Sequence, residues 1–356
     1  MWPRNELVDL LGIDHPIIQA PMSGPTTPAL AAAVSNAGGV GSLGCAELSL
    51  PQLRGQFDQT RSKTTRPFNI NFFAHDTPAY PTDGAATMRE RLATYYEELG
   101  LGQVVALSPS TMRAFDEATL ETVLELRPDI VSFHFGLPAQ EMVDALKSKG
   151  TIILCSATTV AEARQLESAG VHAIVAQGYD AGGHRGTFIE PLEAGNVGTF
   201  SLVPQVVDAV SVPVIAAGGI ADGRGIAAAF ALGASGVQMG TAFLLCPEST
   251  VSPLYREALQ QLRDDGTRLT RAFTGRPARA ITNRFVEEMA PHEREAAPFP
   301  LQDSLTLPLH IRSEEQGSID FAALLTGQAA SLNRALPAGE LIDVLVDEAR
   351  SVLNLA

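Results

Sequence analysis

Glycine-rich turns follow two neighbouring apolar segments of the chain, and turns of this kind can bind a phosphate group. Residues 213–217 form a predicted buried strand that ends at Gly218 and Gly219, and residues 236–240 form a second that opens into a turn at Thr241. Because glycines leave backbone N–H groups uncovered, two such strand ends beside a helix N-terminus predict a site for a phosphate dianion. The alternative is that these glycines serve only turns and tight helix–sheet packing.

Two histidines follow other predicted strands. His134 comes directly after residues 129–133 and lies between two phenylalanines, and His184 lies in a glycine loop at residues 178–186. Histidine suits proton transfer because its ordinary pKa is about 6.5. At the carboxyl end of a barrel strand it points either into the active-site mouth or into a packed layer. We predict His134 as the general base and His184 as a supporting or cofactor-side residue. The other histidines are predicted to be ordinary surface or core residues: His15, His75, His172, His292 and His310.

The segments that must position these residues repeat a pattern of strand and helix. Short apolar runs that do not alternate with polar residues, with helices between them, are typical of a parallel sheet buried on both faces. Eight such strands indicate an α/β fold of the (β/α)8 TIM-barrel class. The predicted strands are 16–24 (stopping at Pro21), 40–43, 68–73, 129–133, 151–155, 173–177, 213–217 and 236–240. The predicted helices between them are 28–37, 140–149, 161–169, 200–210 and 223–232.

Two regions interrupt or extend this pattern. Residues 74–128 form a long insertion after the third strand, with helical patterns at 87–99 and 110–126. Long connections at a barrel rim are often lids, and a decorative insertion is the alternative. Residues 250–356 are predicted as a mostly helical extension packed on the barrel of residues 1–249. Within it, helices are predicted at 253–262, 318–334 and 339–353, mixed structure at 272–285, and little periodicity at 290–308.

Composition excludes several classes of function. The 356-residue chain carries a net charge of −15, which disfavours nucleic acid as a partner. No segment resembles a signal peptide, and no apolar run reaches the roughly 18 residues that a membrane helix needs, so we expect a cytoplasmic protein without a membrane partner. The three cysteines are scattered, so neither a metal site nor a disulfide is predicted. The absence of a G-x-G-x-x-G fingerprint disfavours a doubly wound NAD domain.

Five motifs along the predicted barrel identify a family resemblance. They are QAPMSG (19–24), NINFF (69–73), SFHFGLP (132–138), AQGYDAGGHRG (176–186) and AAGGIADGRGIAAAFALGASGVQMGTAFL (216–244). In order and spacing they resemble the nitronate monooxygenase family, formerly called 2-nitropropane dioxygenases. FPLQDSLTLPL and LLTGQAASLNRALPAGEL resemble the family's C-terminal region. The resemblance implies an FMN-dependent TIM-barrel enzyme that oxidises alkyl nitronates with dioxygen. We expect a monomer or homodimer. Propionate 3-nitronate is the implied toxic substrate.

The resemblance also implies roles for individual residues. Met22, at the end of the first strand, would cover the flavin ring, and amides such as Asn71 and Gln177 suit the flavin's polar edge because it offers donors and acceptors. In the branch with SFHFG the base is the histidine of that motif, here His134, whereas related barrels that use NAD(P)H rely on the AGGH histidine, here His184. The predicted FMN-binding residues are Met22, Asn71, Gln177, Gly182, Gly183, Gly218, Gly219, Gln238, Met239, Gly240 and Thr241.

Two alternatives to nitronate oxidation stay open at this point. One is an FMN- and NAD(P)H-dependent reductase on the same barrel, of the enoyl-acyl-carrier-protein or quinone reductase type, although the SFHFG motif argues against it. The other is a barrel that binds a flavin or phosphate ligand without catalysis. The combination of two histidines and a set of amides at strand ends favours an enzyme.

Overall fold

The computed structural model describes residues 2–189 and 191–355. Eight parallel strands form one sheet in the order β1-β9-β8-β6-β5-β4-β3-β2. A bridge between Ile18 and Val40 joins the two ends of this order, and the Gln19 N–H donates to the Val40 carbonyl at 2.9 Å. The sheet therefore closes, and the predicted (β/α)8 barrel is confirmed. Its strands are β1 (Ile17–Gln19), β2 (Gly41–Gly44), β3 (Phe68–Phe73), β4 (Ile130–His134), β5 (Ile152–Ala157), β6 (Ala173–Gln177), β8 (Val214–Ala217) and β9 (Gly236–Met239).

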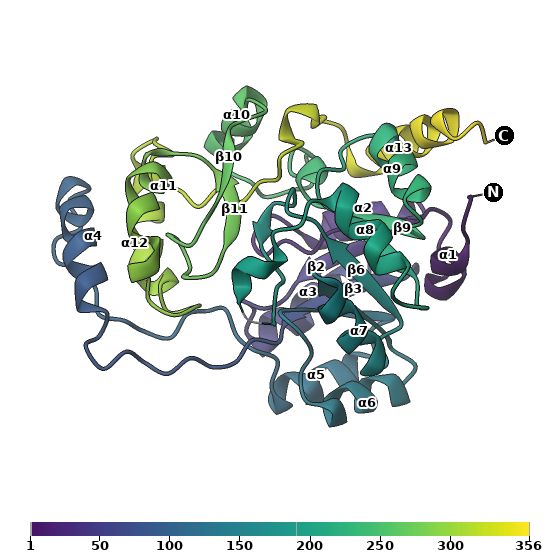
Figure 1. Cartoon of the computed structure of the whole chain (residues 1–356), viewed down its shortest axis with the longest axis horizontal. Helices are drawn as coiled ribbons and strands as arrows, with labels where there is room; N and C mark the ends of the chain where they lie inside the picture. The colour runs from purple at the N-terminus through teal and green to yellow at the C-terminus, as the bar shows by residue number, and fades with distance from the viewer. Residues whose placement is uncertain (1, 190, 356) are drawn as a thin grey trace.

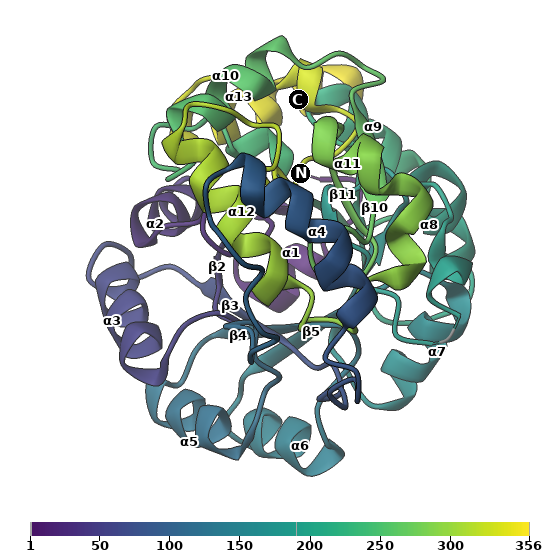
Figure 2. The ribbon, with the colours of Figure 1, turned by 90° about the vertical axis from the view of Figure 1, so that its left-hand side faces the viewer.

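Helices surround the barrel, and several begin where a side chain caps the first turn (Figure 1). The side chains of Thr27, Asp116 and Thr159 each accept an N–H from the first turn, which stabilises a helix start by about 1 kcal/mol. Every helix in the described part of the chain is too short or too polar to cross a lipid bilayer. Helix α1 (Glu6–Leu11) lies at one end of the barrel, inside the ring of the other helices (Figure 2). The helices around the barrel are α2 (Pro28–Asn36), α3 (Leu50–Arg61), α5 (Glu117–Leu126), α6 (Gln140–Ser148), α7 (Val160–Ser168), α8 (Thr199–Val207), α9 (Gly223–Ala231) and α13 (Ala338–Val352).

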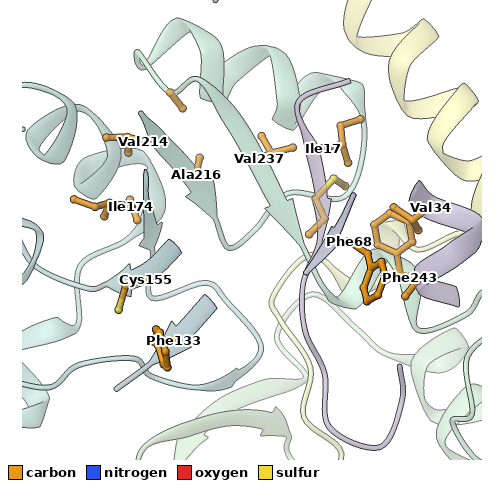
Figure 3. Packing of buried hydrophobic residues seen from close by; sticks show 14 of the residues in the cluster. Ile17, Val34, Phe68, Phe133, Cys155, Ile174, Val214, Ala216, Val237 and Phe243 are labelled. Atoms are coloured by element: carbon orange, nitrogen blue, oxygen red, sulfur yellow. The ribbon is translucent and has the colours of Figure 1, made fainter. Parts of the chain in front are cut away.

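The barrel strands bury apolar side chains on both faces, as expected for a parallel sheet covered by helices. Phe133, Ile174 and Val237 belong to the core cluster formed with the surrounding helices (Figure 3). Neighbouring strand residues such as Leu154 and Val175 belong to a second cluster, which also includes Leu7 and Leu11 of α1. The alternation follows from the period of two along a strand.

A separate apolar cluster joins the insertion to the C-terminal region. Met88, Leu92 and Tyr96 of α4 (Ala86–Glu98) pack with residues such as Phe285 and Leu305, and the Tyr96 hydroxyl donates to the Leu305 carbonyl at 2.8 Å. Figures 1 and 2 show α4 beside α11 and α12, together on one side of the barrel. The insertion and the extension thus share one core, whereas the division of the chain at residue 249 stays a prediction. The extension's helices are α10 (Pro253–Gln261), α11 (Arg284–Met289) and α12 (Asp303–Glu315).

A small antiparallel sheet, which the sequence patterns did not predict, connects the extension to the loop after β6. It has the order β10-β11-β7, formed by β10 (Thr267–Thr270), β11 (Ala278–Ile281) and β7 (Gly183–His184). Ala278 pairs with His184, and Arg279 with Gly183. The extension therefore fixes the backbone of the loop that carries His184.

Several predicted helices are corrected by the structure. Residues 318–334 contain only a 3-10 turn at Ala330–Leu332, because distant segments bind the backbone instead: the Thr326 N–H donates to the Arg279 carbonyl at 3.1 Å. Helix α5 starts at Glu117 rather than at residue 110, and α3 was not predicted. In the segment 290–308, which showed little periodicity, α12 begins at Asp303 and continues through Pro308.

Candidate active site

A cavity of about 710 Å³ opens at the carboxyl ends of the barrel strands. The insertion and the extension complete its walls with residues such as Met112, Phe273 and Asp303. Every residue that the sequence predicted for catalysis or cofactor binding lines this one cavity: Met22, Asn71, His134, Gln177, Gly182, Gly183, His184, Gly218, Gly219, Gln238, Met239, Gly240 and Thr241.

The turns after β8 and β9 present backbone N–H groups to this cavity. Gly218 and Gly219 have φ angles of 113° and 69°, a region that suits glycine. Within residues 2–189 and 191–355, the N–H groups of Gly219, Gly240 and Thr241 donate to no acceptor of the protein. A Cβ built on Gly240 would lie 3.5 Å from the sulfur of Met22, so this methionine adjoins the turn. These turns, Gly218–Gly219 and Gly240–Thr241, form what we call the glycine cradle. Its free donors fit a phosphate group.

Helix α9 follows the turn at Gly218–Gly219, but its N-terminal N–H groups are not free to bind a phosphate. The side chain of Asp222 accepts the N–H groups of Arg224 and Gly225 at the start of α9, at 3.0 and 3.3 Å. Glu348 of α13 accepts the N–H of Gly223 at 3.1 Å. Because carboxylates already occupy the first turn of α9, the expectation that a helix N-terminus takes part in phosphate binding is wrong for this helix.

Two amides at strand ends each keep one group for a ligand. The Gln177 oxygen accepts the Arg185 guanidinium at 3.0 Å and the Gly186 N–H at 2.8 Å, and its nitrogen donates to the His184 carbonyl at 2.9 Å. Asn71 donates from its nitrogen to the Ser132 carbonyl and hydroxyl at 3.1 and 2.8 Å. One N–H of Gln177 and the amide oxygen of Asn71 remain, a donor and an acceptor that suit a polar ring edge.

His134 lies at the end of β4 with both ring nitrogens engaged. Its Nε2 lies 3.1 Å from the His184 carbonyl oxygen, and its Nδ1 lies 2.6 Å from the Ser156 hydroxyl. Burial, reinforced by the charges of Arg276 and Arg185, lowers the pKa of His134 to about 3, although the bond to the carbonyl opposes this shift. The imidazole is therefore neutral at neutral pH.

His184 is held by a residue of the extension. Its Nε2 lies 2.8 Å from the Thr274 hydroxyl, and its ring packs against Phe299 with centroids 5.4 Å apart. Burial and the neighbouring His134, Arg276 and His75 lower the pKa of His184 to about 3. The two catalytic candidates are thus both neutral, and the main chain of one contacts the ring of the other.

An aromatic cluster borders the histidine pair. Phe135 has φ of 70°, a conformation that costs a bulky residue on the order of 1 kcal/mol. Its ring lies 4.4 Å from that of His134 and 4.7 Å from that of Phe73, and the Arg276 guanidinium lies 4.0 Å above it. His75, predicted to be an ordinary residue, belongs to this cluster, 4.9 Å from Phe299. Burial lowers the pKa of His75 to about 4. It does not line the cavity.

Two residues that support the site, Glu162 and Ser156, were not identified from the sequence. The buried Glu162 carboxylate accepts the N–H groups of Thr158, Phe188 and Ile189 at 2.6, 2.7 and 3.1 Å, which fixes the loop after β7. Ser156 was also missed, although a serine directly after a predicted strand could have been noticed at the same rim as His134. Glu162 has no such signal, because its partners in the loop, Phe188 and Ile189, lie 26 and 27 residues away in the sequence.

Comparisons with known proteins identify the family. A family model described as nitronate monooxygenase matches residues 4–348. A protein named "Probable nitronate monooxygenase" from Staphylococcus aureus (strain Newman) is 38% identical over 355 residues, 99% of each chain. The solved nitroalkane oxidase from Streptomyces ansochromogenes shares 38% identity with a TM-score of 0.90, over 98% of this chain and 99% of that one. FabK from Thermotoga maritima shares 31% identity with a TM-score of 0.77, over 99% and 98%. The chain belongs to the nitronate monooxygenase family and is an oxidoreductase.

Proposed function

We propose that the protein oxidises alkyl nitronates with dioxygen, using FMN. The observation that carries the proposal is one cavity in which the glycine cradle, with its free N–H groups, lies with the neutral His134. The flavin supplies the electron chemistry when bound. The glycine cradle would hold its phosphate, and Asn71 and Gln177 would bind its polar ring edge.

The chain's own residues then handle binding and proton transfer. A neutral imidazole accepts a proton, whereas an electrostatic anchor for an anion must be protonated. The lowered pKa of His134 keeps the ring in the neutral form that a general base for neutral nitroalkanes needs, and it argues against a cationic anchor for the nitronate. A preformed nitronate has already lost its α-proton and bypasses this step.

Anaerobic mixing tests the proposal and its alternative. We expect the purified protein to be yellow, to release FMN on heating, and to lose its flavin absorbance when ethylnitronate is added without oxygen. Bleaching by NADH alone would instead support a FabK-type reductase. The structural likeness to FabK is the reason to test this alternative. FAD in the heat extract, or a flavin that neither compound bleaches, would reject the proposed reaction.

Propionate 3-nitronate, with detoxification as the biological role, remains the substrate that the sequence resemblance implies. Its carboxylate would meet no lysine or arginine in the cavity wall, because none of the described lining residues is of either type. Glu47 and Asp303 line the cavity instead. Removal from water and the nearby Asp303 raise the pKa of Glu47.

A cytoplasmic location and a monomeric or homodimeric state also stay predictions.

Glu47→Gln should therefore favour propionate 3-nitronate relative to propyl-1-nitronate, whose tail is uncharged. Removing one repelling charge should raise the ratio of the two kcat/KM values on the order of threefold to tenfold. In the wild type the same ratio should rise as pH falls through the raised pKa of Glu47, because the carboxyl group becomes neutral. Glu141→Gln, the same change on the exposed face of α6, is the control. An equal ratio in all three proteins would contradict the prediction.

A further inference from the structure

The ring of His134 has only one nitrogen that can accept a proton. A carbonyl oxygen only accepts hydrogen bonds, so the contact of 3.1 Å with the His184 carbonyl places a hydrogen on Nε2. In the neutral ring Nδ1 then carries the lone pair. The Gln177 side chain donates to the same carbonyl at 2.9 Å, which helps to hold this acceptor in place.

Ser156 covers that basic nitrogen. Its hydroxyl lies 2.6 Å from Nδ1, and with Nδ1 unprotonated the hydroxyl must be the donor. Ser156 lines the cavity from the end of β5, while only 6% of its surface is exposed. Among the described residues its hydroxyl makes no other hydrogen bond to a side chain. The hydroxyl of Ser156 therefore occupies the basic nitrogen of His134 at the cavity wall, which both residues line.

Gly186 lies against both His134 and Ser156, in a space too small for a side chain. A Cβ at residue 186 would lie 2.8 Å from Cε1 of His134 and 2.8 Å from the Ser156 hydroxyl. The backbone of the loop therefore packs directly on both partners. A side chain at this position would force His134, Ser156 or the loop itself to shift.

We propose that Ser156 relays the α-proton of a neutral nitroalkane to His134, an inference that rests on the proposed function. The C–H bond breaks, and its electron pair forms the C=N bond of the nitronate. Ser156 takes the proton from carbon while its own hydrogen moves to Nδ1. The serine ends neutral and His134 ends as an imidazolium, whose Nε2–H remains bonded to the His184 carbonyl. No other reactant is needed.

Ser156→Ala tests the relay with nitroethane and preformed ethylnitronate as probes. We expect kcat/KM for nitroethane to fall on the order of 10²-fold, a typical contribution of a proton-transfer group. The value for ethylnitronate should fall much less, because that substrate has no α-proton to lose in this step. A solvent isotope effect on nitroethane turnover, expected for the wild type, should disappear. Ser156→Thr keeps a hydroxyl and should restore part of the activity.

Two further variants keep the result interpretable. Ser168→Ala removes an exposed hydroxyl on α7 and controls for the chemical change alone. Gly186→Ala keeps Ser156 but adds a Cβ that clashes with both partners, so it should disturb their contact and lower nitroethane turnover in the same selective way. Nitroethane turnover unchanged in Ser156→Ala, or an equal loss on both substrates, would overturn the relay. A wild-type protein inactive on ethylnitronate would instead reject the proposed function itself, and the relay with it.

Discussion

His134→Asn should lose turnover of nitroethane by about 10² to 10⁴-fold while retaining most of its oxidation of preformed ethylnitronate. The asymmetry follows from the lowered pKa: a neutral imidazole takes a proton from the neutral substrate but provides little electrostatic attraction for the anion. Steady-state kinetics on both substrates, with the flavin content of each variant measured, check this result.

The pH dependence of nitroethane turnover tests the role of His134 as general base a second time. Since the pKa of His134 is lowered to about 3, the base should remain unprotonated between about pH 5 and pH 8. As pH falls through the ordinary pKa of histidine, nitroethane turnover should therefore not decrease through protonation of His134. Such a loss, present in the wild type and absent in His134→Asn, would mean that the imidazole titrates normally.

His184→Asn is the decisive comparison for the catalytic assignment. His184 binds Thr274 through Nε2, and no hydrogen bond of the described residues occupies its Nδ1. It is thus a second histidine of the cavity that could act as the base, beside His134. Unimpaired activity of His134→Asn together with a collapse in His184→Asn would move the base to His184 and favour the reductase-like branch of the family.

Gly219→Asp should yield a folded protein that lacks the flavin. The new carboxylate would lie in the glycine cradle, where a phosphate dianion is proposed to bind, and the repulsion should weaken FMN affinity on the order of 10² to 10³-fold. A Cβ at this position meets only the side chain of Asp180, at 3.3 Å, so the fold can accept it. The ratio of flavin to protein absorbance after purification, and titration of the apoprotein with FMN, measure the effect.

Gly100→Asp is the matched control for this variant. Its φ of 70° nearly equals the 69° of Gly219, so both substitutions carry the same backbone penalty of about 1 to 2 kcal/mol. Nothing lies within 4 Å of a Cβ at residue 100, which follows α4 far from the glycine cradle. Equal flavin content in the two variants would show that the cradle is not the phosphate site.

The sequence by itself determined the barrel and the convergence of its candidate residues. Apolar runs that do not alternate indicate parallel strands buried on both faces, and eight such runs with helices between them allow few other arrangements. In a parallel barrel all carboxyl ends lie at one rim, so residues that follow different strands, such as Asn71, His134 and Gly219, meet in one cavity. Local pattern was sufficient because each βα unit repeats the same rule.

Only the tertiary structure decided how those residues are used. Ser156 joins His134 across 22 residues of sequence, and Thr274 joins His184 across 90. The carboxylates of Asp222 and Glu348 occupy the start of α9, which a local pattern had offered to a phosphate. Residues 318–334 lack a long helix because Thr326 and Gly327 bond to Arg279 and Thr241. Such partners lie far apart in the chain, and their hydrogen bonds outweigh a local helix propensity that is worth less than about 1 kcal/mol per residue.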